Sequence, residues 1–110
     1  SKVMHDSSLY LNSKAMEHRQ KSYIGNDLIK THINQYFSPP KNFNEFVKLS
    51  QKTQAIGLEI AINSHMNKSP HCMGTLFWQF NDCWPGPSWS IIDYYGNKKD
   101  AYFSVKKAFK

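Results

Sequence analysis

The 110-residue sequence is long enough for one small domain, and its content of 40% apolar and 15% aromatic residues excludes a disordered segment. The net charge of +6 comes from scattered lysines, with no basic run of the kind that binds nucleic acid. No window approaches 18 apolar residues, so no membrane span is expected.

Two helices are predicted in the N-terminal third. The first should cover about 9–21, with Asp6, Ser7 or Ser8 as its N-cap and a basic last turn. Gly25 ends it, and Asn26 or Asp27 should cap the next helix. That second helix is predicted over 28–37 from apolar residues at helical spacing, and Ser38-Pro39-Pro40 ends it.

The best-marked helix is predicted over 43–66. Asn42 and Glu45 have the spacing of a capping box, and apolar residues then recur at helical intervals. Gly57 lies inside this helix, where glycine costs about 1 kcal/mol relative to alanine. The sequence therefore predicts that Gly57 lets another element approach closely.

A single principal buried strand is predicted at about 73–80. Leu76, Trp78 and Phe80 alternate with Thr75, Phe77 and Gln79, and both sets contain large apolar groups. A strand that is apolar on both faces is typical of a parallel α/β sheet. Because no second strand of similar quality is present, partner strands must come from missing chain or from another copy.

An aromatic loop broken by Pro85-Gly86-Pro87 follows the strand, and Gly96-Asn97 marks a turn. A last helix is predicted over 98–109. Cys72 and Cys83 lie too far apart along an extended segment to form a disulfide, and they are expected to be two small buried thiols. The histidines have no zinc-site spacing, and no phosphate-binding glycine loop is present, so no metal or other cofactor is predicted.

The segment from Met73 to Pro85, MGTLFWQFNDCWP, strongly resembles the β-mannosidases of glycoside hydrolase family 2. Ser88-Trp89-Ser90 and Asp93-Tyr94-Tyr95 extend the match. The resemblance implies an α/β fold class, as the C-terminal fragment of a TIM (β/α)8 barrel. Residues 1–110 would then be a single segment running from after strand seven through helix eight, with 73–80 as strand eight and 43–66 as helix seven.

The resemblance implies a substrate-binding role for Trp78, Asn81 and Asp82 at the end of the barrel strand. Trp78 would form an apolar platform under the sugar in the −1 subsite. Asp82 could equally brace the loop, so both roles stay open. Trp84 and Trp89 are possible loop or subsite residues, with packing of the loop favoured over contact with substrate.

The family is a group of retaining glycosidases that use two glutamates, and neither glutamate motif is present in this chain. Asn44-Glu45 imitates one of them, but Glu45 has a ready role at the helix start. The resemblance therefore implies no catalytic residue in this chain, and the isolated chain is expected to be inactive. Its partners would be a β-mannoside and the rest of a parent barrel, or a second copy by self-association, without nucleic acid or membrane.

Alternatives are a β-galactosidase or β-glucuronidase of the same family, a carbohydrate-binding module built on its three tryptophans, and, least favoured, a basic nucleic-acid-binding domain. The missing initiator methionine favours a piece of a longer protein. No signal peptide is recognised at Ser1, and the family resemblance makes periplasmic, secreted or lysosomal locations plausible.

Overall fold

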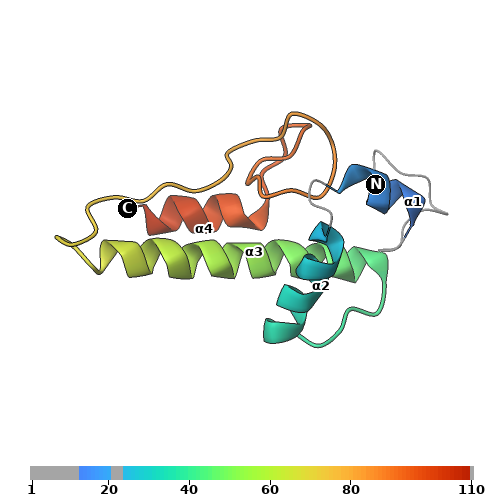
Figure 1. Cartoon of the computed structure of the whole chain (residues 1–110), viewed down its shortest axis with the longest axis horizontal. Coiled ribbons are helices and arrows are strands. Elements are labelled where there is room, and N and C mark those ends of the chain that lie inside the picture. Colours follow the sequence, from blue (N-terminus) through green and yellow to red (C-terminus); the bar gives the residue numbers. More distant parts are fainter. Residues whose placement is uncertain (1–12, 21–23, 110) are drawn as a thin grey trace.

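The computed structural model describes residues 13–20 and 24–109, and this part of the chain contains four helices (Figure 1). They are α1 (Lys14–Arg19), α2 (Gly25–Tyr36), α3 (Phe43–Met66) and α4 (Asp100–Ala108). The long helix α3 is the central element of the molecule, which measures 51 × 30 × 23 Å. Helix α4 and the extended segment before it lie along α3, and α2 crosses α3 near its N-terminal end (Figure 1).

Helix α3 has the predicted bounds, and its start is fixed by its cap. Asn42 Oδ1 accepts a hydrogen bond of 2.9 Å from the backbone N–H of Glu45. The Glu45 carboxylate accepts from the N–H of Lys41 at 2.6 Å, one residue beyond the usual capping-box donor. The cap satisfies donors that the first turn of a helix leaves unpaired.

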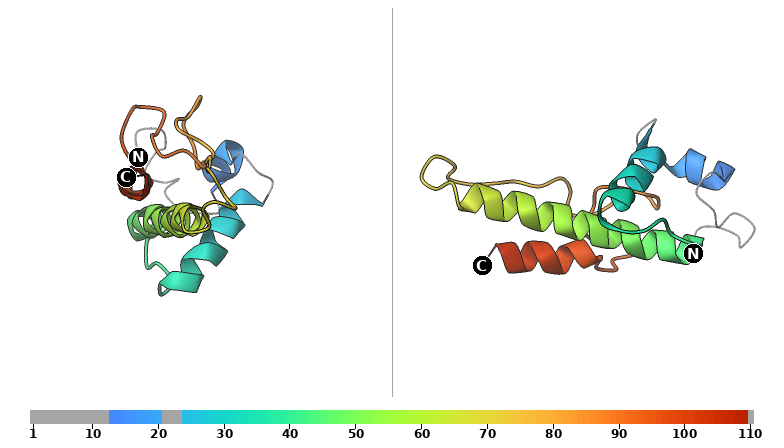
Figure 2. Two further views of the ribbon diagram at one scale, coloured as in Figure 1. Left: turned by 90° about the vertical axis from the view of Figure 1, so that its left-hand side faces the viewer. Right: turned by 90° about the horizontal axis from the view of Figure 1, so that it is seen from below.

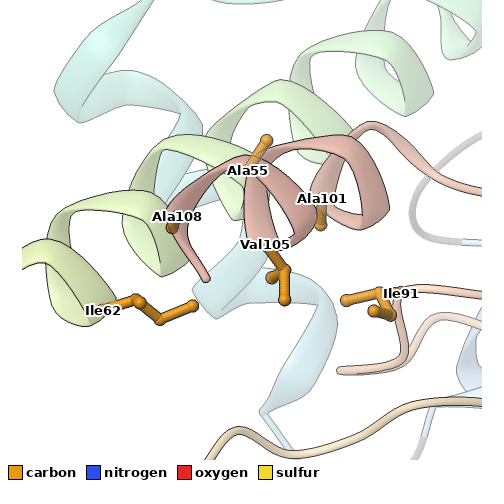
Figure 3. Packing of buried hydrophobic residues seen from close by; sticks show 6 residues of the cluster. All are labelled: Ala55, Ile62, Ile91, Ala101, Val105 and Ala108. Carbon is orange, nitrogen blue, oxygen red and sulfur yellow. The ribbon is translucent and has the colours of Figure 1, made fainter. Parts of the chain in front are cut away.

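Helices α3 and α4 lie side by side and run in the same direction, and the chain between them returns as an extended segment (Figures 1 and 2). Their contact contains a core of small and branched apolar residues, shown in Figure 3: Ala55, Ile62, Ile91, Ala101, Val105 and Ala108. On α4, Ala101, Val105 and Ala108 recur at the i, i+4 and i+7 spacing of one helix face. The alanines let the two helix axes approach closely.

A second, smaller core joins α1 and α2 to the first turns of α3. It is built from Met16, Ile33 and Phe46, all less than 9% exposed, with partly buried residues around them. Helix α1 lies inside the predicted range 9–21 and is capped by Ser13, whose hydroxyl accepts from the N–H of Met16. The predicted caps at residues 6–8 lie outside the described residues.

Two local predictions in the helices are wrong. Helix α2 starts at Gly25 without a side-chain cap, and the side-chain amide of Asn26 instead donates to the carbonyl oxygen of Met16 in α1. A Cβ added at Gly57 would meet nothing within 4 Å, so this glycine accommodates no close neighbour.

The predicted buried strand at 73–80 is also wrong: among the described residues this segment is extended but belongs to no sheet and is largely exposed on one face. Its last residues, Gln79 and Phe80, make backbone hydrogen bonds to the returning chain, and the bridges lie just beyond, between Asn81 and Ile92 and between Ile92 and Lys98. The reason is the lack of partner strands, without which an extended segment cannot form a ladder or cover both of its faces. An α/β barrel fragment is therefore not visible from this chain by itself.

Candidate functional site

The extended segment has two unlike faces. On the inner face Phe77 packs against the α3–α4 core, and its ring lies 6.3 Å from that of Phe109. On the outer face the side chains of Leu76, Trp78 and Phe80 are 98%, 72% and 58% exposed. The alternation predicted from the sequence is therefore present, but only one of the two apolar faces is covered.

Trp78 lies immediately before the loop that closes back on the segment. The backbone N–H of Gln79 donates to the carbonyl oxygen of Trp89 at 3.3 Å, and Ile91 N–H donates to Gln79 at 3.1 Å. The peptide bond between Trp78 and Gln79 is cis. The two hydrogen bonds of Gln79 attach the backbone on the C-terminal side of Trp78 to the returning arm of the loop.

Asn81 follows at the start of the loop and is exposed, in the parallel bridge with Ile92. Its carbonyl oxygen accepts a hydrogen bond of 2.6 Å from the Gln79 side chain. Its side-chain amide lies on the surface, where it can reach a polar ligand.

Asp82 is placed differently from Asn81, since its side chain is 1% exposed. Its Oδ2 accepts hydrogen bonds from the hydroxyls of Ser88, at 2.7 Å, and Ser90, at 2.5 Å. Lys99 Nζ lies 3.9 Å from the same oxygen and donates to Ser90 Oγ at 2.9 Å. Asp82 therefore belongs to a buried polar cluster that connects the two arms of the loop.

The two loop tryptophans have different surroundings. Trp84 is half-buried, and its ring meets that of His18 edge to face at 6.2 Å. Trp89 is 48% exposed, and its carbonyl oxygen accepts a hydrogen bond of 2.8 Å from the side-chain amide of Gln54 on α3. The structure thus places Trp78, Asn81 and Trp89 with exposed side chains, and Trp84 and Asp82 against the protein.

The turn that follows the loop is stabilised by Asp93. Its carboxylate accepts from the backbone N–H groups of Tyr95 and Asn97 and from the Asn97 side chain, all between 2.8 and 2.9 Å. Burial acts to raise the pKa of the Asp93 carboxyl, but these hydrogen bonds and the charge of Lys99 outweigh it, so the pKa is lowered. Gly96, at φ 84°, completes the predicted turn in a conformation that favours glycine.

Sequence reasoning missed the residues that hold the loop in place: Arg19, Gln54, Ser88, Ser90 and Lys99. Arg19 donates to the carbonyl oxygen of Pro85 across 66 residues, and Gln54 reaches Trp89 and Ser90 from 35 or 36 residues away. No local sequence pattern predicts contacts between residues so far apart in the chain. Only the serines had a signal, because they lie in the family-like Ser-Trp-Ser sequence.

Within the described residues, no group of His, Cys, Asp or Glu side chains could hold a metal ion, and no helix is long and apolar enough to cross a membrane. Both cysteines are free thiols, but the prediction that they are buried is wrong, since Cys72 is only partly buried and Cys83 is exposed. A shallow hollow near the end of α3 is lined by His65, Met66, Ser69, Cys72, Met73 and Gly74, and it shares no residue with the Trp78 loop.

No family model matches the chain. Beta-mannosidase B of Aspergillus oryzae is 28% identical over 98% of this chain, and that of Emericella nidulans is 27% identical over the same share. Beta-mannosidase B of Thermothelomyces thermophilus is 62% identical over 37 residues, or 34% of this chain. Among solved structures, the β-D-mannosidase from Dictyoglomus thermophilum superposes with a TM-score of 0.92 and 40% identity over 96% of this chain.

This chain matches a segment of the β-mannosidases. The resemblance indicated by the sequence is therefore confirmed at that level, in sequence and in three dimensions. The chain spans 13% of the length of the Aspergillus oryzae and Emericella nidulans relatives and of the Dictyoglomus thermophilum structure, and 4% of the Thermothelomyces thermophilus protein is aligned.

Proposed function

We propose that this chain is part of a retaining β-mannosidase-type glycoside hydrolase of family 2, and that it forms one wall of the pocket for a terminal β-linked mannose. The observation that carries the proposal is the outward face of Trp78, 72% exposed beside a loop closed by hydrogen bonds, in a chain that matches β-mannosidases along nearly its whole length. An exposed indole on a fixed backbone suits a sugar, because its face packs against C–H groups and its N–H donates to a hydroxyl.

The barrel origin of the segment has support in the arrangement of its helices. Helices α3 and α4 pack side by side and run in the same direction, and the extended segment that connects them runs back the other way (Figure 2). Successive helices of a (β/α)8 barrel have this relation, because each strand between them runs back the other way. The bare outer face of Leu76, Trp78 and Phe80 would then be covered by the rest of the barrel and by substrate.

The catalytic carboxylates of the proposed reaction must come from outside this chain. A retaining glycosidase needs two carboxyl groups about 5–5.5 Å apart. The chain has three glutamates, Glu17, Glu45 and Glu59. Glu45 and Glu59 lie about 21 Å apart along α3, at 1.5 Å per residue. Glu45 accepts the Lys41 N–H at the helix start, and Glu59 pairs with Lys107 at 3.4 Å.

The direct test is a hybrid enzyme in which this chain replaces the matching segment of the Dictyoglomus thermophilum β-D-mannosidase. We expect the hybrid to hydrolyse 4-nitrophenyl β-D-mannoside, and Trp78→Ala to lower kcat/KM by at least about tenfold, which corresponds to about 1.4 kcal/mol of transition-state stabilisation. The matched control is Phe103→Ala, which removes an exposed aromatic ring outside the loop, on α4, and should change kcat/KM little.

A folded but inactive hybrid would contradict the proposal, and so would a Trp78→Ala hybrid with full activity. The isolated chain should show no turnover of the same substrate, and turnover that disappears in Glu45→Gln would place a catalytic acid here. Three tryptophans with partly or largely exposed rings also fit a non-catalytic carbohydrate-binding module. That alternative requires calorimetrically detectable binding of mannose or manno-oligosaccharides by the isolated chain.

A further inference from the structure

We infer that Lys99 and Asp82 form a buried ion pair that positions the loop of residues 81–92, and through it the groups that would contact the sugar. Both act as positioning residues, with no contact to substrate. The inference rests on the proposed function and deepens it, because it assigns Asp82 one of the two roles that the sequence left open and gives Lys99 a role that no sequence motif indicated.

The first step of the argument is the burial of both charges. The Asp82 side chain is 1% exposed and that of Lys99 is 14% exposed. Ionised side chains are rarely buried unless they are paired, because removing a charge from water is costly. An aspartate at this depth is poorly placed to reach a ligand on the surface, whereas its neighbour Asn81 is exposed.

The second step is the way the charges are connected. The 3.9 Å between Lys99 Nζ and Asp82 Oδ2 is bridged by the hydroxyls of Ser88 and Ser90. Each hydroxyl has one proton, and donating it to Asp82 leaves lone pairs to accept from Lys99, at 3.4 Å for Ser88 and 2.9 Å for Ser90. Ser90 is fully buried. The four side chains thus form one complementary network.

The third step is where the network is attached. Asp82 lies on the outgoing arm of the loop, Ser88 and Ser90 on the returning arm, and Lys99 is the N-cap residue of α4. The Lys99 backbone N–H also donates to the carbonyl oxygen of Ile91 at 2.9 Å. Because α4 packs on α3 through the main core, Lys99 attaches the loop to the helix pair.

The consequence is that the loop keeps its shape only while the network is complete. Removing Lys99 takes a positive charge away from a buried carboxylate, and removing the Asp82 charge takes a negative charge away from a largely buried ammonium group, and either change is costly in a buried network. In either case the two arms can separate, and the bridge that holds Asn81 beside Ile92 is weakened. Misplacement of substrate-positioning groups by about 1 Å can reduce catalysis a hundredfold.

The test uses the hybrid enzyme with Lys99→Met, Asp82→Asn and the double variant, and Lys106→Met as a control that removes one exposed lysine from the same helix. Each is assayed well below its own unfolding midpoint. We expect each single variant to lose about ten- to a hundredfold in kcat/KM and the double variant to lose no more than the worse single one. Lys99→Arg, which keeps the charge, should recover part of the activity.

Additive losses in the double variant, or full activity of Lys99→Met, would overturn the inference. An inactive hybrid with the unchanged segment would instead contradict the proposed function, and the inference is then decided in the 110-residue chain. There, Lys99→Met should accelerate hydrogen exchange at the amides of Ser90, Ile91 and Ile92, with α2 unaffected. Unchanged exchange at these amides would also overturn it.

Discussion

Arg19, the last residue of α1, donates a hydrogen bond of 3.0 Å from Nη1 to the carbonyl oxygen of Pro85 at the tip of the aromatic loop. The next residue, Gly86, lies directly against the Arg19 backbone. The N-terminal helix and the loop are therefore in contact although 66 residues separate them. The loop is held from three directions, by α1, by Gln54 on α3, and by Lys99 at the start of α4.

Gly86→Ala should destabilise the contact between α1 and the loop. An added Cβ would lie 2.6 Å from the backbone carbonyl oxygen of Arg19, too close for either backbone to remain in place. Overpacking of this kind costs about 1–3 kcal/mol, to be measured as a lower free energy of unfolding in urea. Gly74→Ala, where the added Cβ meets nothing within 4 Å, is the control and should leave stability nearly unchanged.

Gly57→Ala should stabilise the protein by about 0.5–1 kcal/mol. Gly57 lies in the middle of α3, where alanine loses less backbone entropy on folding, and the added methyl group has open space. A raised thermal unfolding midpoint would be the evidence. A lowered midpoint would mean that Gly57 faces a neighbour, as the sequence had predicted.

Ile62→Ala should cost about 2–5 kcal/mol, because Ile62 is 2% exposed in the core between α3 and α4 (Figure 3). Ile60→Ala on the same helix removes an identical side chain that is 56% exposed, and should change stability by less than about 0.5 kcal/mol. The pair of denaturant titrations separates the burial of isoleucine from its effect on helix propensity. Equal losses in both variants would contradict the assignment of this core.

Asp93 should make the protein more stable above its ordinary pKa of 3.8 than below it. Its folded pKa is lowered, so between the folded and unfolded values the unfolded chain binds more protons and stability rises with pH. The contribution is fully present above 3.8 and disappears as the pH falls through the folded pKa. Asp93→Asn should therefore show a smaller loss of unfolding free energy between pH 5 and pH 2 than the unchanged chain. The same pH dependence in both proteins would remove Asp93 from this role.

The helices were predicted well because their signals are local. The cap at Asn42 and the apolar spacing through Ile62 are both read within a few residues, and α3 has the predicted bounds. The segment at 73–80 was predicted wrongly as a buried strand, although its alternation is real. Exposure of Leu76 depends on whether another strand lies beside it, and no pattern inside the segment determines that.

In the candidate site, too, some features follow from the local sequence and others depend on neighbours in space. The sequence by itself determined which residues surround Trp78 and the resemblance to β-mannosidases, because a motif is a property of neighbours in the chain. Only the tertiary structure decided that Asn81 is exposed while Asp82 is buried against Ser88, Ser90 and Lys99. These two adjacent polar residues differ in exposure because the loop folds back on itself. Closure of the loop depends on contacts between residues distant in sequence, which local propensity does not predict.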